Sequence, residues 1–268
     1  MPLAVCATPI GNLEDVTLRV LGELGEADLV LCEDTRRTRV LLDRHGIEAP
    51  LASFHRHNEA ARTVEILRRL EGDERIALVS DAGLPGVNDP GARLLAAALA
   101  AGVPTTVLPG PSAVETALVA SGLVADRYQF VGYLPRRDVE LTALARELTE
   151  WQSAVVAFES PRRLPRSLAA LAGEMPDREA AVCRELTKRF EQVVRGSLDE
   201  LAQRFREPPR GEITLVLGPW AVEETVDLEN ALAAVGELVS AGVSRRPAVD
   251  LVARLTGASR NELYRRSL

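Results

Sequence analysis

The first half of the chain alternates short apolar runs with amphipathic helix patterns, and this alternation restricts the fold more than any other feature. Four runs rich in valine and leucine are predicted as strands, at residues 3–7, 29–32, 76–80 and 105–108. Strands that are apolar on both faces are typical of parallel sheets covered by helices. Helix patterns occupy the intervals, at residues 16–24, 37–45, 59–70 and 92–101, with Gly46 and Gly102 as predicted C-terminal stops. An open, mainly parallel α/β sheet is therefore predicted.

The second half is predicted to form a different sheet. Its strand patterns lie at residues 129–133, 154–158, 180–184, 192–195 and 212–217, and its helix patterns at 141–148, 163–171 and 198–205. The runs around Val182 and Val193 are too close for a crossover helix, so this sheet is expected to be mixed. Beyond Gly218 the pattern is purely helical. We expect an N-terminal α/β domain over 1–124, a C-terminal α/β domain over 125–222, and a small helical extension over 223–268.

The charge of the chain is unevenly distributed. The formal net charge is -7, and 46% hydrophobic with 26% charged residues is an ordinary composition for a folded protein. Residues 243–268 nevertheless carry six arginines against Asp250 and Glu262. A basic tail on an acidic body suggests a polyanionic partner. A solvated helical face, or an appendage that packs on the body or on a second subunit, accounts for the tail equally well.

Several classes of protein are disfavoured. No apolar run approaches the roughly 18 residues of a membrane span, and no basic stretch precedes the first apolar run as in a signal peptide. Cys6, Cys32 and Cys183 lie in predicted buried strands without the spacing of disulfides or zinc ligands. Neither a dinucleotide fingerprint nor a P-loop is present. We expect a cytoplasmic protein without a metal site.

The loop after the third predicted strand is the strongest candidate for a ligand site, because ligands of open α/β sheets bind beyond the carboxyl ends of the strands. Residues 81–91 contain three glycines and two prolines, which is more than a strand-to-helix turn requires. Helix capping accounts for Asp89, placed before Pro90, and for Ser112, paired with Glu115. It leaves Asp81 unexplained, and Asp81 is therefore predicted to contact a ligand.

These loops also carry long motifs. The runs TPIGNLEDVTLRVL, EDTRRTRVLL, SDAGLPGVNDPG, LPGPSAVETAL, FVGYLPR, FESPRRL, CRELTKRFEQVVRGSL and GEITLVLG follow one another in order. The chain thereby resembles the small-subunit ribosomal RNA methyltransferases of the tetrapyrrole methylase superfamily. The resemblance implies a homodimer of two-domain subunits that bind S-adenosylmethionine between the domains. It further implies 2′-O-methylation of a cytidine ribose in the decoding region of 16S rRNA, in the 30S subunit.

The resemblance also implies site residues. The expected cofactor contacts are Pro9, Ile10, Asp81, Ala82, Gly83, Leu84, Ser112, Ala113, Phe158 and Glu212. The family usually has threonine where this chain has Leu84, so a side-chain hydrogen bond there is in doubt. The arginines expected to bind RNA are Arg36, Arg37, Arg136, Arg162, Arg163, Arg245 and Arg246, and Arg184 and Arg189 lie in the same motifs.

Methyl transfer from a sulfonium needs no metal, but the ribose hydroxyl needs a base or an orienting carboxylate. Candidates in the motifs are Glu33, Asp34, Glu159, Glu185 and Lys188, of which Lys188, Glu185 and Asp34 are predicted to be catalytic. Lys188 can act as a base only if its pKa is depressed, and it could equally hold a phosphate. Two alternatives remain open: a precorrin-type tetrapyrrole C-methyltransferase, and a non-catalytic RNA-binding protein of ribosome assembly.

Overall fold

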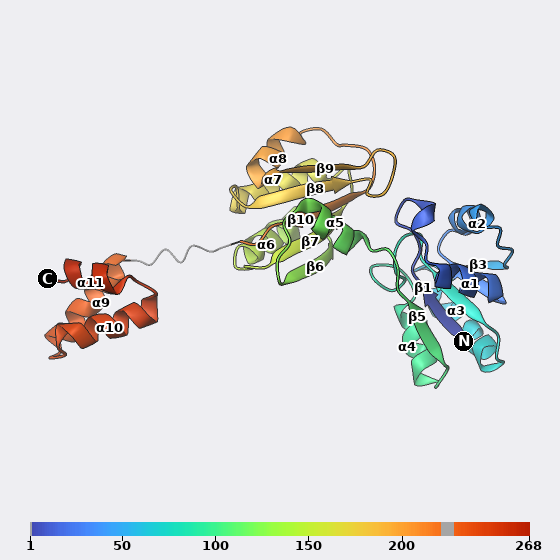
Figure 1. The fold of residues 1–268 in the computed structure, drawn as a ribbon, viewed down its shortest axis with the longest axis horizontal. Coiled ribbons are helices and arrows are strands. Elements are labelled where there is room, and N and C mark those ends of the chain that lie inside the picture. Colours follow the sequence, from blue (N-terminus) through green and yellow to red (C-terminus); the bar gives the residue numbers. More distant parts are fainter. Residues whose placement is uncertain (1, 221–227) are drawn as a thin grey trace. The chain divides into compact units, whose positions relative to one another are not determined.

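A computed structural model describes residues 2–220 and 228–268. The chain divides into two compact units, residues 1–220 and 221–268, and each is described by itself. The larger unit contains two five-stranded sheets, and the smaller one is helical (Figure 1). The α/β fold with a parallel sheet, a mixed sheet and C-terminal helices is therefore confirmed. The predicted domain boundary at 222/223 lies outside the described residues, and the boundary at 124/125 stays a prediction.

The first sheet is entirely parallel. Its strands are β1 (Leu3–Cys6), β2 (Leu29–Cys32), β3 (Leu51–Ser53), β4 (Ile76–Val79) and β5 (Thr105–Leu108), in the spatial order β3-β2-β4-β1-β5. The helices that follow the strands are α1 (Leu18–Glu26), α2 (Thr35–Arg44), α3 (Glu59–Glu71) and α4 (Ala92–Ala100), preceded by the short 3-10 helix η1 (Leu13–Asp15). Because all strands run in one direction, the loops after β1, β2 and β4 meet at one edge of the sheet.

Both faces of this sheet are buried, as the apolar runs predict. Successive residues of β1 alternate between two cores: Leu3 and Val5 pack into one, and Ala4 and Cys6 into the other. Strand β3 was not predicted from the sequence, because it has only three residues and all of them are half-buried. Helix α1 begins two residues later than predicted, because the hydroxyl of Thr17 accepts a hydrogen bond from the amide of Val20 and starts the helix there.

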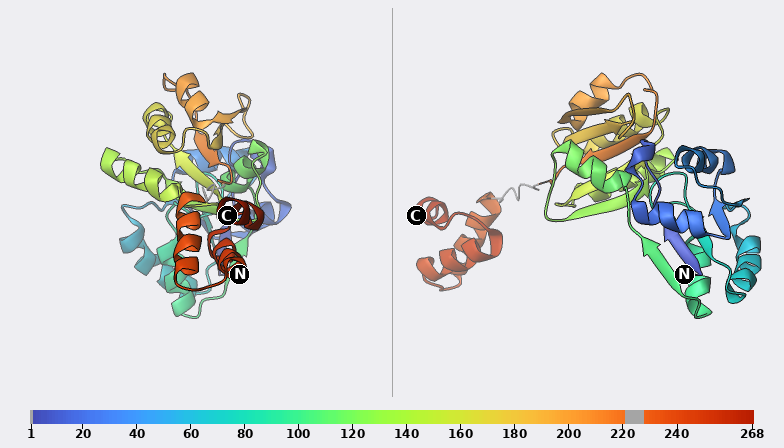
Figure 2. Two further views of the ribbon diagram at one scale, coloured as in Figure 1. Left: turned by 90° about the vertical axis from the view of Figure 1, so that its left-hand side faces the viewer. Right: turned by 45° about the vertical axis from the view of Figure 1, so that its right-hand side comes forward.

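The second sheet is mixed, in agreement with the prediction. Its strands are β6 (Tyr128–Tyr133), β7 (Ala154–Glu159), β8 (Glu179–Arg184), β9 (Gln192–Ser197) and β10 (Ile213–Leu217), in the order β6-β7-β10-β8-β9. Only β6 and β7 pair in parallel, and the other neighbours are antiparallel. Helices α6 (Asp138–Leu148), α7 (Leu164–Glu174) and α8 (Leu198–Arg204) belong to this half, and Figure 2 gives two further views of them. Helix α5 (Ala113–Ser121) follows β5 in sequence but packs against β7, β8 and β10 of this sheet.

The small unit contains α9 (Leu228–Ser240), α10 (Arg245–Thr256) and α11 (Arg260–Arg266) around a core of its own. Gly257 ends α10 in the left-handed conformation, with a φ of 71°. Ser259 precedes α11 as its N-cap, but its side chain makes no capping hydrogen bond. Among the described residues, no helix is long and apolar enough to cross a membrane.

Candidate active site

A pocket of about 260 Å³ lies at the carboxyl edge of the first sheet. Residues after three of its strands and two residues of the second sheet's half form the walls. They are Thr8, Pro9, Ile10, Gly11, Leu13, Arg37, Thr38, Val40, Leu41, Ser80, Asp81, Ala82, Lys188 and Glu212. The loop predicted to bind a ligand therefore does border a pocket.

The loops after β1 and β4 are joined behind this pocket. Thr8 and Gly83 exchange two backbone hydrogen bonds, of 2.9 and 3.0 Å between nitrogen and oxygen. The hydroxyl of Ser80 donates to the carbonyl of Gly83 at 2.9 Å, and that of Thr8 donates to the carbonyl of Ser80 at 3.0 Å. Gly83 has a φ of +77°, a conformation that side chains disfavour. This tie fixes Asp81 and Ala82 beside Pro9 and Ile10 in the pocket wall.

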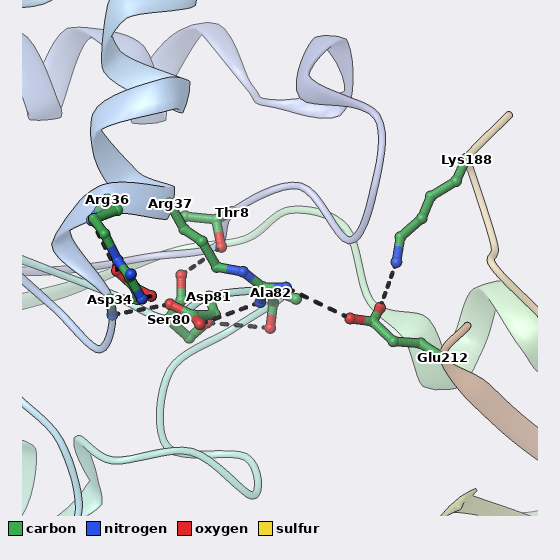
Figure 3. A network of polar contacts seen from close by, with 9 residues as sticks. All are labelled: Thr8, Asp34, Arg36, Arg37, Ser80, Asp81, Ala82, Lys188 and Glu212. Carbon is green, nitrogen blue, oxygen red and sulfur yellow. Dashed lines mark hydrogen bonds and ion pairs between the residues drawn. The ribbon is translucent and has the colours of Figure 1, made fainter. Parts of the chain in front are cut away.

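Asp81 lies at the start of a row of charged groups (Figure 3). Its Oδ1 accepts a hydrogen bond from the backbone amide of Asp34 at 3.1 Å, and its Oδ2 accepts one from Nη1 of Arg37 at 3.2 Å. Nη2 of Arg37 lies 4.0 Å from Oε1 of Glu212. A row of alternating charges thus runs from Asp81 along one side of the pocket to the second sheet's half.

Lys188 is held between two carboxylates at the far end of this row. Its Nζ lies 2.8 Å from Oε2 of Glu212 and 3.0 Å from Oε1 of Glu185. Burial of the ammonium opposes its charge, but the hydrogen bonds that it donates to Glu212 and Glu185 outweigh that effect and raise the pKa of Lys188. The depressed pKa that a basic role requires is therefore absent, and Lys188 is a cation at neutral pH.

The carboxylates predicted to be catalytic are also stabilised in the charged form. Hydrogen bonds from the side chain and amide of Arg36 hold the pKa of Asp34 far below its usual range. The carboxylate of Glu185 accepts a hydrogen bond from the backbone amide of Glu212 and another from the ammonium of Lys188. These bonds, the first above all, lower the pKa of Glu185 despite its partial burial. Poor proton acceptors result in both cases.

Glu159 is buried, and its carboxylate is used in contacts within the fold. It is 2% exposed, and it accepts hydrogen bonds from the hydroxyl of Ser167 and the amide of Ser160 and forms an ion pair with Arg163. Buried carboxylates are normally satisfied in this way. Glu33, the remaining carboxylate among the candidates, is half-buried beyond the end of β2.

Asp89 is the acidic residue that the sequence interpretation misassigned. Helix α4 begins at Ala92 with Gly91 as its N-cap, so the prediction that Asp89 caps the helix is wrong. Burial, followed by the negative charge of Glu33, raises the pKa of Asp89 to about 6. A carboxylate with this pKa can both exist as an anion at neutral pH and accept a proton.

The other predicted cofactor residues lie outside the pocket wall. Leu84 packs against the core of the first sheet, which gives this leucine an apolar role in place of a hydroxyl contact. Ala113 and Phe158 pack against another core, beneath α5. The predicted capping box at Ser112 is wrong, because its hydroxyl donates to the carboxylate of Glu115 and caps no backbone amide.

The predicted RNA-binding arginines differ in their surroundings. Arg36, Arg37 and Arg163 form ion pairs with Asp34, with Asp81 and Glu212, and with Glu159. Arg136 and Arg162 are exposed, and within the described part of the chain their guanidinium groups have no hydrogen bond or ion pair. Arg245 and Arg246 form the first turn of α10 in the small unit. Over residues 2–220 and 228–268, no cluster of His, Cys, Asp and Glu could hold a metal ion.

Comparison with known proteins identifies the family. Residues 2–202 match the family model described as Tetrapyrrole (Corrin/Porphyrin) Methylases. The chain belongs to the tetrapyrrole methylase family. Within it, the chain is 41% identical to ribosomal RNA small subunit methyltransferase I of Mesorhizobium japonicum, over 99% of this chain and 91% of that protein. The protein of the same name from Mycobacterium tuberculosis is 42% identical, over 98% of this chain and 93% of its own length. The family resemblance of the sequence motifs is thus confirmed.

Solved structures of the family share the fold at low sequence identity. Uroporphyrin-III C-methyltransferase of Thermus thermophilus, complexed with S-adenosyl homocysteine, has a TM-score of 0.59 and 19% identity, over 81% of this chain and 96% of that one. The cobalt precorrin-4 methyltransferase has a TM-score of 0.61 and 18% identity, over 81% and 94%. Both show that the two sheets form a methyltransferase fold.

Proposed function

We propose that this chain transfers a methyl group from S-adenosylmethionine to the 2′-hydroxyl of a cytidine in the decoding region of 16S rRNA. The main support is sequence identity of 36–42% with ribosomal RNA small subunit methyltransferases I over 98–99% of this chain. Such coverage includes the basic helical unit as well as both sheets. The proposed substrate is the 30S particle, and the proposed place of action is the cytoplasm. A homodimer stays a prediction.

The pocket at the carboxyl edge of the first sheet suits the proposed donor. Pro9, Ile10, Leu13 and Ala82 supply an apolar wall for the adenosine part. Asp81 adds a carboxylate, which favours a ligand that carries a positive sulfonium. When bound, S-adenosylmethionine supplies an electrophilic methyl group with a neutral leaving group. The chain therefore has to position the acceptor hydroxyl and manage its proton.

Asp89 is proposed to receive that proton. Asp89 lies within electrostatic reach of Asp81 in the pocket wall, and its pKa of about 6 suits proton transfer near neutral pH. Asp34 and Glu185 are held as anions, and Lys188 is held as a cation. Lys188 is thus proposed to position Glu212 and Glu185 through its two ion pairs, in place of the basic role considered from the sequence.

The alternatives receive less support. The structural neighbours that methylate tetrapyrroles are 18–21% identical to this chain, which supports a common fold only. A non-catalytic RNA-binding protein would leave the pocket around Asp81 without a purpose. Calorimetry with S-adenosylmethionine separates this second alternative from an enzyme, because only the enzyme binds the donor.

Mapping of transferred label tests the proposal. The protein is incubated with tritiated S-adenosylmethionine and either 30S particles or naked 16S rRNA, and the label is located by nuclease digestion and mass spectrometry. We expect label on one cytidine ribose in the assembled particle. Label on a base, or no label from either substrate, would contradict the proposed function.

A further inference from the structure

Tyr133, the last residue of β6, has an orientation that regular strand geometry does not allow. Side chains alternate between the faces of a strand. Phe130 packs with the core beneath α5, and Val131 packs with the core on the opposite face. Regular alternation would place Tyr133 on the same face as Val131. Its ring instead contacts Phe158, with 5.5 Å between centroids, on the face where Phe130 also meets Phe158 at 4.9 Å.

A β-bulge at Gly132 causes this change of face. The register between β6 and β7 shifts between Phe130 and Tyr133, and Gly132 has a φ of +71°. A Cβ at position 132 would lie 3.1 Å from Oδ1 of Asn88, so glycine also allows the loop after β4 to approach. Bulges commonly redirect a side chain beside a functional site. Here the bulge brings Tyr133 toward the loop that contains Asp89.

The ring of Tyr133 is exposed in spite of its packing on Phe158. The residue is 59% exposed, although an aromatic side chain normally buries most of its surface. The partial burial of the residue, followed by the negative charges of Asp89 and Glu212, raises the pKa of its hydroxyl. The hydroxyl end is therefore near the acidic groups of the candidate active site, while one side of the ring remains open.

Two arginines with unpaired guanidinium groups follow the strands that carry Tyr133 and Phe158. Arg136 follows β6 and Arg162 follows β7, and these strands are parallel neighbours, so the two loops leave the same edge. The loops are also joined: Arg163 donates to the carbonyl of Leu134 at 3.2 Å, and Arg166 donates to that of Arg136 at 3.0 Å. Arg163 and Arg166 are thus used within the fold, whereas the side chains of Arg136 and Arg162 make no polar contact with the described residues.

We propose that Tyr133, Arg136 and Arg162 form the binding site for the acceptor nucleotide, in which the unstacked base lies on the Tyr133 ring and the two arginines hold the flanking phosphates. An open aromatic ring and unpaired cations at one edge of a sheet are the combination that binds single-stranded nucleic acid. The inference rests on the proposed function, and it specifies the substrate as a base displaced from its helix. It also explains why a bulge directs an aromatic side chain to the surface.

Variants at these positions test the site, with 30S methylation kinetics and calorimetric binding of S-adenosylmethionine as the two measurements. Tyr133→Ala is expected to lower kcat/KM for 30S particles by about 10- to 100-fold, the range for loss of one stacked base. Tyr133→Phe, which keeps the ring, should stay within about threefold of the wild type by the same reasoning. Donor affinity should be unchanged in both, which also shows that the variants fold.

The arginines are tested through salt dependence. Arg136→Ala and Arg162→Ala should each weaken binding of 30S particles and reduce the slope of log affinity against log salt by about one. Arg127→Ala is the matched control, because Arg127 is exposed and precedes β6 at the opposite end of the strand. It should leave both the affinity and the slope unchanged.

The outcomes separate this inference from the proposed function. If the wild type methylates 30S particles but Tyr133→Ala keeps its kcat/KM, or if Arg136→Ala and Arg162→Ala behave like Arg127→Ala, the acceptor site is wrong and the function stands. If Tyr133→Ala loses affinity for the donor, the ring belongs to the cofactor site and the inference is also wrong. If the wild type labels no RNA, the proposed function fails and this inference fails with it.

Discussion

Replacement of Asp89 by asparagine should stabilise the protein while it impairs methyl transfer. The pKa of Asp89 is raised from 3.8 to about 6, with burial as the main cause and the charge of Glu33 as the second. The folded state therefore holds the proton more tightly than the unfolded state, and stability falls as the pH rises from about 4 to about 6. Above this range the folded protein bears the full cost of the buried anion.

The size of the effect follows from the pKa. A change from 3.8 to about 6 corresponds to about 3 kcal/mol for a fully buried group. Asp89 is only half-buried, and solvent screening reduces the expected gain of Asp89→Asn at pH 8 to roughly 1–2 kcal/mol. At pH 5 the gain should be about half as large, since part of the wild-type population is then protonated.

Urea unfolding followed by far-UV circular dichroism at both pH values measures this gain. Asp126→Asn removes the same charge from an exposed loop, and its free energy of unfolding should change by less than about 0.5 kcal/mol. In the same samples, Asp89→Asn should lower the rate of 30S methylation by about 10²- to 10⁴-fold, without changing the affinity for the donor. A variant that is no more stable than the wild type at pH 8 would refute the electrostatic argument, and a fully active variant would remove Asp89 from the chemistry.

Three further variants test other parts of the account. Asp81→Ala should weaken binding of S-adenosylmethionine by about 10- to 100-fold in calorimetry, which is the effect of losing one or two charge-assisted contacts; unchanged affinity would exclude Asp81 from the donor site. Lys188 acts as a cation between Glu212 and Glu185, so Lys188→Arg should keep the methylation rate within about tenfold of the wild type. Lys188→Met removes the charge and should lower the rate further. An inactive arginine variant would indicate that Lys188 acts as a base. Arg178 is fully buried, and its guanidinium donates to the carbonyls of Leu148, Trp151, Ser153 and Gly218. Arg178→Met should destabilise the protein by about 3–5 kcal/mol in thermal or urea unfolding, since four buried or partly buried carbonyls lose their donor. A cost below about 1 kcal/mol would show that the carbonyls find other partners.

The sheets could be predicted because their strands are runs of apolar residues, which indicate burial directly in the sequence. Strands β2 and β5 have the predicted bounds, and all three cysteines are buried without a disulfide, as expected. Strand β3 escaped prediction because three half-buried residues carry no periodicity. The cores therefore followed from local apolar patterns, and the short edge strand did not.

The site could be predicted only in part. Asp81 was singled out because helix capping does not explain a carboxylate directly after a buried strand, and it lines the pocket, whereas its contact with a ligand stays a prediction. The state of Lys188 could not be found, since it depends on Glu212, 24 residues away in the chain and adjacent only through the pairing of β8 with β10. Capping motifs gave wrong predictions at Asp89 and Ser112. Helix α4 begins three residues after Asp89, with Gly91 as its N-cap, and the hydroxyl of Ser112 binds the carboxylate of Glu115 in place of a backbone amide.

Tyr133 was missed for a different reason. Its face is set by the bulge at Gly132, and an isolated glycine within a strand pattern was the signal that could have indicated it. The exposure of the ring and the unpaired state of Arg136 and Arg162 are tertiary properties. They become visible only when the loops after β6 and β7 are placed together.

The most direct test of the central claim is a crystal structure of the protein with S-adenosylhomocysteine. We expect the ligand to occupy the pocket bordered by Pro9, Ile10, Asp81 and Ala82, with its sulfur directed toward Asp89 and Tyr133. Ligand bound elsewhere on the chain, or a pocket that remains empty at saturating ligand, would contradict it.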